Sequence, residues 1–85
     1  MHIEGDFMRL SEANIGQRLI IKKVHGKGET KRRIMEMGIT KGAKIHIDKL
    51  APLGDPINFK VRDYDLSLRR KDAKEIEVLE VEAVE

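Results

Sequence analysis

Histidine and carboxylate side chains are the residues of this sequence that suggest metal chemistry. His46 stands two residues before Asp48, and residues i and i+2 of a strand share one face, so this pair could contribute two ligands. Metal sites usually show tight ligand spacing, such as two histidines four residues apart, whereas His2, His25 and His46 are scattered along the chain. We therefore predict no metal site. A third, weaker hypothesis is a metal sensor in which His46 and Asp48 are the candidate ligands.

Phosphate binding and covalent catalysis find little support in the residues. The glycine-rich segment at residues 25–31, His-Gly-Lys-Gly-Glu-Thr-Lys, lacks the spacing of a phosphate-binding P-loop and is typical of a turn that enters a helix. The sequence contains no cysteine, and neither Ser11 nor Ser67 has a histidine nearby in a pattern that indicates activation. We expect a protein that is not an enzyme.

Basic side chains are the strongest chemical signal. The chain has 85 residues, 38% of them charged, and a net charge of +2. This total divides into +7 for residues 1–74 and −5 for residues 75–85. A basic body could bind the phosphates of nucleic acid, so a small-barrel nucleic-acid-binding protein is the alternative hypothesis. Small barrels that bind single strands stack bases on aromatic rings, and only Phe7, Phe59 and Tyr64 are present, with Phe59 predicted to be buried.

The elements that must position these residues are mostly short strands. Apolar residues alternate with polar ones in bursts separated by glycine, proline and aspartate, which is typical of a small all-β domain. In the first strand, Ile21 and Val24 are three residues apart, so a β-bulge at Lys22–Lys23 would return both side chains to the core. The predicted strands are Arg18–Val24, Lys44–Leu50, Ile57–Val61, Leu66–Leu68 and Ile76–Val78, the last leaving the core near Val78.

One helix is predicted at about residues 30–37. Thr30 can cap its N-terminus, and Gly38 suits the left-handed conformation that ends many helices. A further helical turn is expected within Arg70–Glu75. Five to six short strands with one short helix predict a small β-barrel, and both SH3-like and OB-like barrels satisfy this count.

Domain organisation is expected to be simple. We predict an N-terminal lead-in at residues 1–9 that need not be ordered, one domain at residues 10–79 and an acidic tail at residues 80–85. The alternating tail could pair with a basic edge of its own barrel or of a second copy, which leaves a homodimer open. The longest apolar run is Leu19–Ile21 and no secretory signal is evident, so a cytoplasmic location is expected.

Three segments together resemble a known family. They are Arg33-Ile34-Met35-Glu36-Met37-Gly38-Ile39-Thr40-Lys41-Gly42, then Ala51-Pro52-Leu53-Gly54-Asp55-Pro56-Ile57, then residues 66–78, Leu-Ser-Leu-Arg-Arg-Lys-Asp-Ala-Lys-Glu-Ile-Glu-Val. In order and spacing they are similar to the ferrous iron transport protein A (FeoA) family over nearly the whole chain. Lys41, Ser67 and Asp72 depart from the residues usual in that family.

The resemblance implies an SH3-like barrel and a cytosolic accessory role in ferrous iron uptake, together with the membrane permease FeoB and its GTP-binding domain. It also makes Fe(II) a candidate ligand, on family grounds alone. We expect a partner-binding surface with apolar contacts from Met35, Met37 and Leu53 and a polar rim of Arg32, Arg33 and Arg69. The residues expected to shape the supporting turns are Gly38, Gly42, Pro52, Gly54, Asp55 and Pro56.

Overall fold

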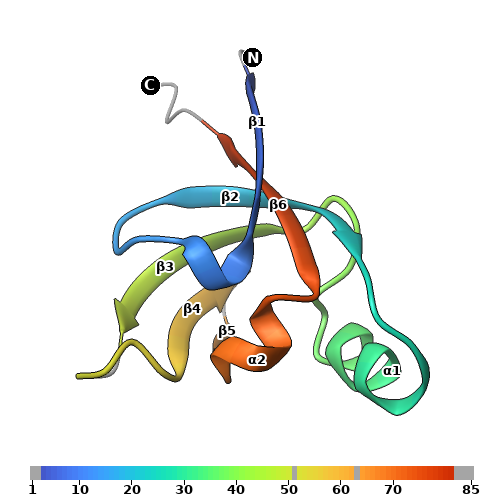
Figure 1. Cartoon of the computed structure of the whole chain (residues 1–85). Helices are drawn as coiled ribbons and strands as arrows, with labels where there is room; N and C mark the ends of the chain where they lie inside the picture. Colours follow the sequence, from blue (N-terminus) through green and yellow to red (C-terminus); the bar gives the residue numbers. More distant parts are fainter. Residues whose placement is uncertain (1–2, 51, 63, 82–85) are drawn as a thin grey trace.

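The computed structural model describes residues 3–50, 52–62 and 64–81. Six antiparallel strands form one curved sheet in the order β1-β6-β2-β3-β4-β5 (Figure 1). The strands are β1 (Ile3–Arg9), β2 (Arg18–Val24), β3 (Lys44–Leu50), β4 (Ile57–Val61), β5 (Tyr64–Leu68) and β6 (Ile76–Val81). The helical elements are the 3-10 turn η1 (Leu10–Glu12), α1 (Gly28–Glu36) and α2 (Arg70–Ala73). The predicted class, a mostly-β domain of five to six short strands with a short α-helix, is confirmed.

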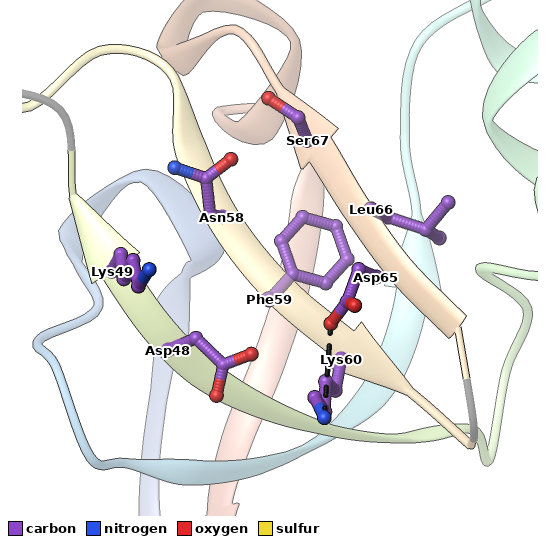
Figure 2. Close-up of a pocket in the computed structure, with 8 residues that line it drawn as sticks. All are labelled: Asp48, Lys49, Asn58, Phe59, Lys60, Asp65, Leu66 and Ser67. Atoms are coloured by element: carbon purple, nitrogen blue, oxygen red, sulfur yellow. Dashed lines mark ion pairs between the residues drawn. The ribbon is translucent and has the colours of Figure 1, made fainter.

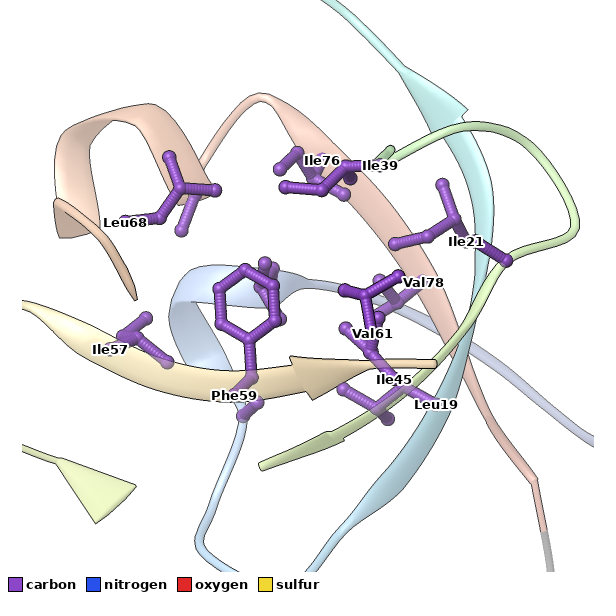
Figure 3. Packing of buried hydrophobic residues seen from close by; sticks show 14 of the residues in the cluster. Leu19, Ile21, Ile39, Ile45, Ile57, Phe59, Val61, Leu68, Ile76 and Val78 are labelled. Carbon is purple, nitrogen blue, oxygen red and sulfur yellow. The ribbon is translucent and has the colours of Figure 1, made fainter. Parts of the chain in front are cut away.

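The core lies on the concave side of the sheet. Ile45 and Ile47 of β3 are buried, and so are the alternate residues Ile57, Phe59 and Val61 of β4. Figure 3 shows the Phe59 ring pointing from β4 into the space between the strands. Each large apolar side chain that is fully buried contributes about 1.5–3 kcal/mol relative to exposure, so these alternating residues hold the curved sheet around its core.

A bulge bends β2 where the sequence predicts one. The register of β2 against β6 shifts between Ile21 and Lys23. The extra residue returns the side chain of Val24 to the core side, and both Ile21 and Val24 are buried. A second shift lies between Ile47 and Lys49 in the pairing of β3 with β4, so Asp48 sits at an irregular position.

Helix α1 begins earlier than predicted. Its N-cap residue is Lys27, without a side-chain cap, and Thr30 lies inside the helix rather than at the cap. Gly26 has a φ of +89°, which turns the chain before the helix, and Glu29 in the first turn suits the positive end of the helix dipole. At the other end, Gly38 has a φ of +92° and its N–H donates to the carbonyl of Met35.

The N-terminal lead-in is the main difference from the sequence-based expectation. Residues 3–9 form β1, which pairs with β6 through Phe7 and Leu79, Met8 and Val78, and Arg9 and Glu77. Short-range alternation could not reveal this strand, because its partner lies some seventy residues away in the sequence.

Strand β6 also extends further than predicted. It continues to Val81 between β1 and β2 rather than leaving the sheet near Val78. Leu79 is buried because Phe7 of β1 and Ile20 of β2 are its cross-strand neighbours. Residues 80 and 81 of the predicted acidic tail therefore belong to β6, and residues 82–85 lie outside the described residues.

Candidate protein-docking site

Three segments lie at the same end of the barrel, with α2 between the other two (Figure 1). They are α1, the β3–β4 loop at residues 52–56, and residues 69–74, which contain α2; we call this surface the helical end. Figure 1 shows it opposite the end at which β1 begins and β6 ends. An ion pair joins the two helices, since Arg33 Nη2 lies 3.3 Å from Asp72 Oδ2. Residues that are far apart in sequence thus share one surface.

Arg70 connects the β3–β4 loop to the rest of this end. Its backbone N–H donates to Asp55 Oδ1 at 3.0 Å, and its Nε donates to the carbonyl of Gly54 at 3.1 Å. Its Nη1 donates to the carbonyl of Ser11 in η1 at 2.6 Å. The half-buried side chain therefore ties the loop to η1. Sequence reasoning missed this role, because Arg70 stands in a run of three basic residues and no local pattern marks which of them turns inward.

The predicted apolar contacts divide into exposed and packed side chains. Leu53 is 94% exposed in the β3–β4 loop, and Met35 is 42% exposed on α1. Met37, just after α1, is only partly buried and packs against the core. The structure thus places two of the three predicted side chains in solvent, while the third also supports the fold.

The predicted basic rim lies on the two helical segments. Arg32 and Arg33 are exposed on α1, and Arg69 is exposed at the N-cap of α2. Among ion pairs between residues that the structure describes, Arg33 is the one of these three that takes part, with Asp72. The structure brings this rim to the same end of the barrel as the loop that carries Leu53.

The predicted turn residues lie where the chain reverses direction. Gly38, Gly42 and Gly54 all have positive φ, of +92°, +91° and +80°. Gly54 is further constrained, since a Cβ at this position would lie 2.9 Å from Arg70 Nη2. In the β3–β4 loop Pro52, Asp55 and Pro56 are exposed, and the Asp55–Pro56 peptide bond is cis.

The candidate metal ligands lie on the outer face of the sheet. His46 Nδ1 is 3.5 Å from Asp48 Oδ1, so the structure does bring this pair together. Within residues 3–50, 52–62 and 64–81, no group of three or more histidine, cysteine, aspartate or glutamate side chains could hold a metal ion. His25 instead contacts Glu77, with Nε2 and Oε1 2.8 Å apart, and His2 lies outside the described residues.

Asp48 borders an open, polar hollow of about 660 Å³ over β3, β4 and β5. Lys49 and Lys60 line it too, and Figure 2 shows Lys60 reaching toward Asp65, with Nζ and Oδ1 3.9 Å apart. Two ammonium groups in the same hollow offset the carboxylates electrostatically, so the hollow is ill suited to a cation.

The aromatic side chains are separated by the strand order. Phe59 is buried in the core, as predicted. Phe7 on β1 and Tyr64 on β5 are 58% and 63% exposed, but these two strands form opposite edges of the sheet order. Base stacking on a small barrel usually uses several aromatic rings, and Phe7 and Tyr64 are the two exposed ones among the described residues.

No helix in the described part of the chain has the length and apolarity needed to cross a membrane.

Comparison with known proteins identifies the family. The FeoA domain family model matches residues 8–80. The chain is 46% identical over 71 residues to the Fe(2+) transport protein A/Fe(2+) transporter FeoB fusion protein of Porphyromonas gingivalis. That match covers 84% of this chain but only 8% of the fusion protein, so the chain spans a small part of that relative.

Solved structures of similar fold lead to the same family. The FeoA-like protein of Clostridium acetobutylicum is 34% identical, with a TM-score of 0.83 over 100% of this chain and 95% of that chain. The zinc complex of Stenotrophomonas maltophilia FeoA, a prokaryotic SH3 domain protein and candidate activating factor of ferrous iron transport, is 27% identical, with a TM-score of 0.74 over 84% of this chain and 88% of that chain. The chain is an SH3-like barrel and belongs to the FeoA family.

Proposed function

We propose that this chain is a non-enzymatic accessory protein of ferrous iron uptake that binds the GTP-binding iron permease FeoB and regulates it. The observation that carries the proposal is the relative in Porphyromonas gingivalis, in which a similar FeoA segment and FeoB form one polypeptide. Covalent linkage keeps two modules at high effective concentration, which is of use when the modules bind one another. This chain would then act in the cytoplasm, at the inner face of the membrane where the permease resides.

The helical end is the proposed docking surface. Interfaces between proteins combine an apolar centre with a polar rim and are enriched in methionine and arginine. Met35 and Leu53 supply exposed apolar area, and Arg32 and Arg69 supply exposed guanidinium groups on the adjoining helical segments. The polar hollow over β3, β4 and β5 offers a weaker surface, since its Lys60 and Asp65 already face one another.

The test is a titration of the chain with full-length permease in nanodiscs of zwitterionic lipid, with permease-free nanodiscs as the blank. We expect the wild type to bind, and an Arg32→Glu, Met35→Asp double variant to lose most of its affinity. Both substituted side chains are exposed, so the variant should remain folded. A matched control, Ile15→Asp with Arg18→Glu, changes one exposed apolar and one exposed basic residue outside the three segments of the helical end and should bind like the wild type. Absence of wild-type binding, or equal affinity of the two double variants, would overturn the proposal.

A further inference from the structure

Leu53 is almost fully exposed, yet the loop that carries it is held in place. The side chain is 94% exposed, the largest exposure among the large apolar side chains described. The two residues that follow it are bonded to Arg70, Gly54 through its carbonyl and Asp55 through its carboxylate. An apolar side chain on a fixed loop loses little conformational entropy when a partner covers it.

Arg70 acts as a brace between three segments. One guanidinium group reaches both the loop and η1, through the carbonyls of Gly54 and Ser11. The absence of a side chain at Gly54 lets the guanidinium lie against the loop backbone, because a Cβ there would be 2.9 Å from Nη2. The half-buried position of Arg70 and its three hydrogen bonds set the direction in which the loop leaves the barrel.

The helical end as a whole is basic. Residues 27–36, 52–56 and 69–74 together contain eight basic and four acidic side chains, for a net charge of +4. Two of the four acids have partners within the protein: Asp72 pairs with Arg33, and Asp55 accepts from the N–H of Arg70. A hydrogen bond from a backbone N–H leaves the negative charge of Asp55 in place, so the excess of positive charge at the helical end is the net +4, and a complementary partner surface would be acidic.

We propose that Leu53 is an apolar side chain held ready to insert into a pocket on a partner protein, and we call it the plug. The pocket is apolar at its base and acidic at its rim. Arg70 is the residue that positions the plug. The inference rests on the proposed function, in which that partner is the permease. A protein pocket fits better than an anionic bilayer for two reasons. A loop held in one conformation matches a pocket of fixed shape, whereas insertion into a fluid bilayer does not require a fixed loop. The exposed Arg32, Arg33 and Arg69 carry planar guanidinium groups that pair with carboxylates in defined geometry.

The test measures the affinity of the full chain for permease in zwitterionic nanodiscs. Burial of one leucine corresponds to a change of roughly 10- to 100-fold in affinity, so Leu53→Ser should weaken binding by about that factor. The control is Ile15→Ser, which removes an exposed apolar side chain elsewhere and should leave the affinity unchanged; Leu53→Ser itself should fold normally because Leu53 is so exposed.

Arg70 is tested by a double-mutant cycle. Arg70→Met should weaken binding in the wild-type background but should have little further effect once Leu53 is serine, because a positioning residue acts through the group that it positions. A merely structural role would lower affinity equally in both backgrounds, and that result would overturn the assignment of Arg70.

The remaining outcomes separate the two proposals. If the wild type does not bind the permease, both the proposed function and the proposed insertion of Leu53 into a pocket of the permease are rejected. If the wild type binds and Leu53→Ser binds equally well, the plug alone is wrong. If permease-free nanodiscs of anionic lipid bind the wild type but do not bind the Leu53→Ser variant, the partner is a membrane surface and the protein pocket is rejected.

Discussion

Arg33 Nη2 lies 3.3 Å from Asp72 Oδ2, and this ion pair joins α1 to α2 although the two residues are 39 positions apart in the sequence. The Arg33 side chain is 63% exposed, so solvent screens the pair strongly. We expect Arg33→Gln to lower the free energy of unfolding by at most about 1 kcal/mol, measured by urea denaturation. A loss of several kcal/mol would show that this contact supports the barrel rather than only aligning the two helices.

The side chain of Ile34 packs α1 against the core of the barrel. It is the buried residue of the helix, with no exposed area, and it belongs to the core cluster. Ile34→Ala should lower the free energy of unfolding by about 2–5 kcal/mol, because the substitution leaves a cavity as well as removing apolar contacts. Ile15→Ala is the matched control, since Ile15 is 62% exposed and its truncation should cost less than about 0.5 kcal/mol. Similar losses in both variants would contradict the packing described for α1.

Gly38 ends α1 in a left-handed conformation. Its φ is +92°, and a Cβ there would meet no heavy atom within 4 Å, so a substitution is penalised through the backbone rather than by a clash. Gly38→Ala should destabilise the protein by about 1–2 kcal/mol. Gly38→Asn should cost less, because asparagine adopts this conformation more readily. Thermal unfolding of the two variants checks the order; equal melting temperatures for Gly38→Ala and the wild type would argue against it.

Strand β1 should contribute to stability although the sequence pattern places it outside the domain. Phe7 pairs with Leu79, which is only 5% exposed. A chain that begins at Met8 lacks most of β1 and uncovers part of Leu79, so we expect a loss of roughly 1–3 kcal/mol by urea denaturation. Phe7→Tyr in the full-length chain keeps the ring and should have little effect. Unchanged stability after truncation would mean that β1 is dispensable.

Period-two alternation in the sequence was enough to place most of the sheet. Ile57, Phe59 and Val61 are buried as predicted, and the spacing of Ile21 and Val24 correctly predicted a bulge. These features depend on neighbours within a few residues, which the sequence displays directly.

Features that depend on distant partners were not predictable in this way. Leu79 follows the predicted end of the last strand near Val78, and its burial becomes evident only once β1 is known to lie beside it. The start of α1 was missed because Gly26 in the preceding turn, rather than a side-chain cap at Thr30, redirects the chain into the helix. For the docking surface, exposed Leu53 and the basic rim could be proposed from the sequence, but the brace formed by Arg70 required the carbonyls of Ser11 and Gly54 to be placed in space.

Hydrogen–deuterium exchange of this chain, alone and with the full-length permease, tests the docking surface most directly. If the helical end binds the permease, backbone amides of residues 28–36, 53–55 and 70–74 should exchange more slowly in the complex, while those of residues 57–62 and 64–67, in β4 and β5, should not change. Contact with a partner excludes water and suppresses local opening, so protection should be confined to the covered segments. Protection of residues 57–62 and 64–67 with none at the helical end would contradict the account.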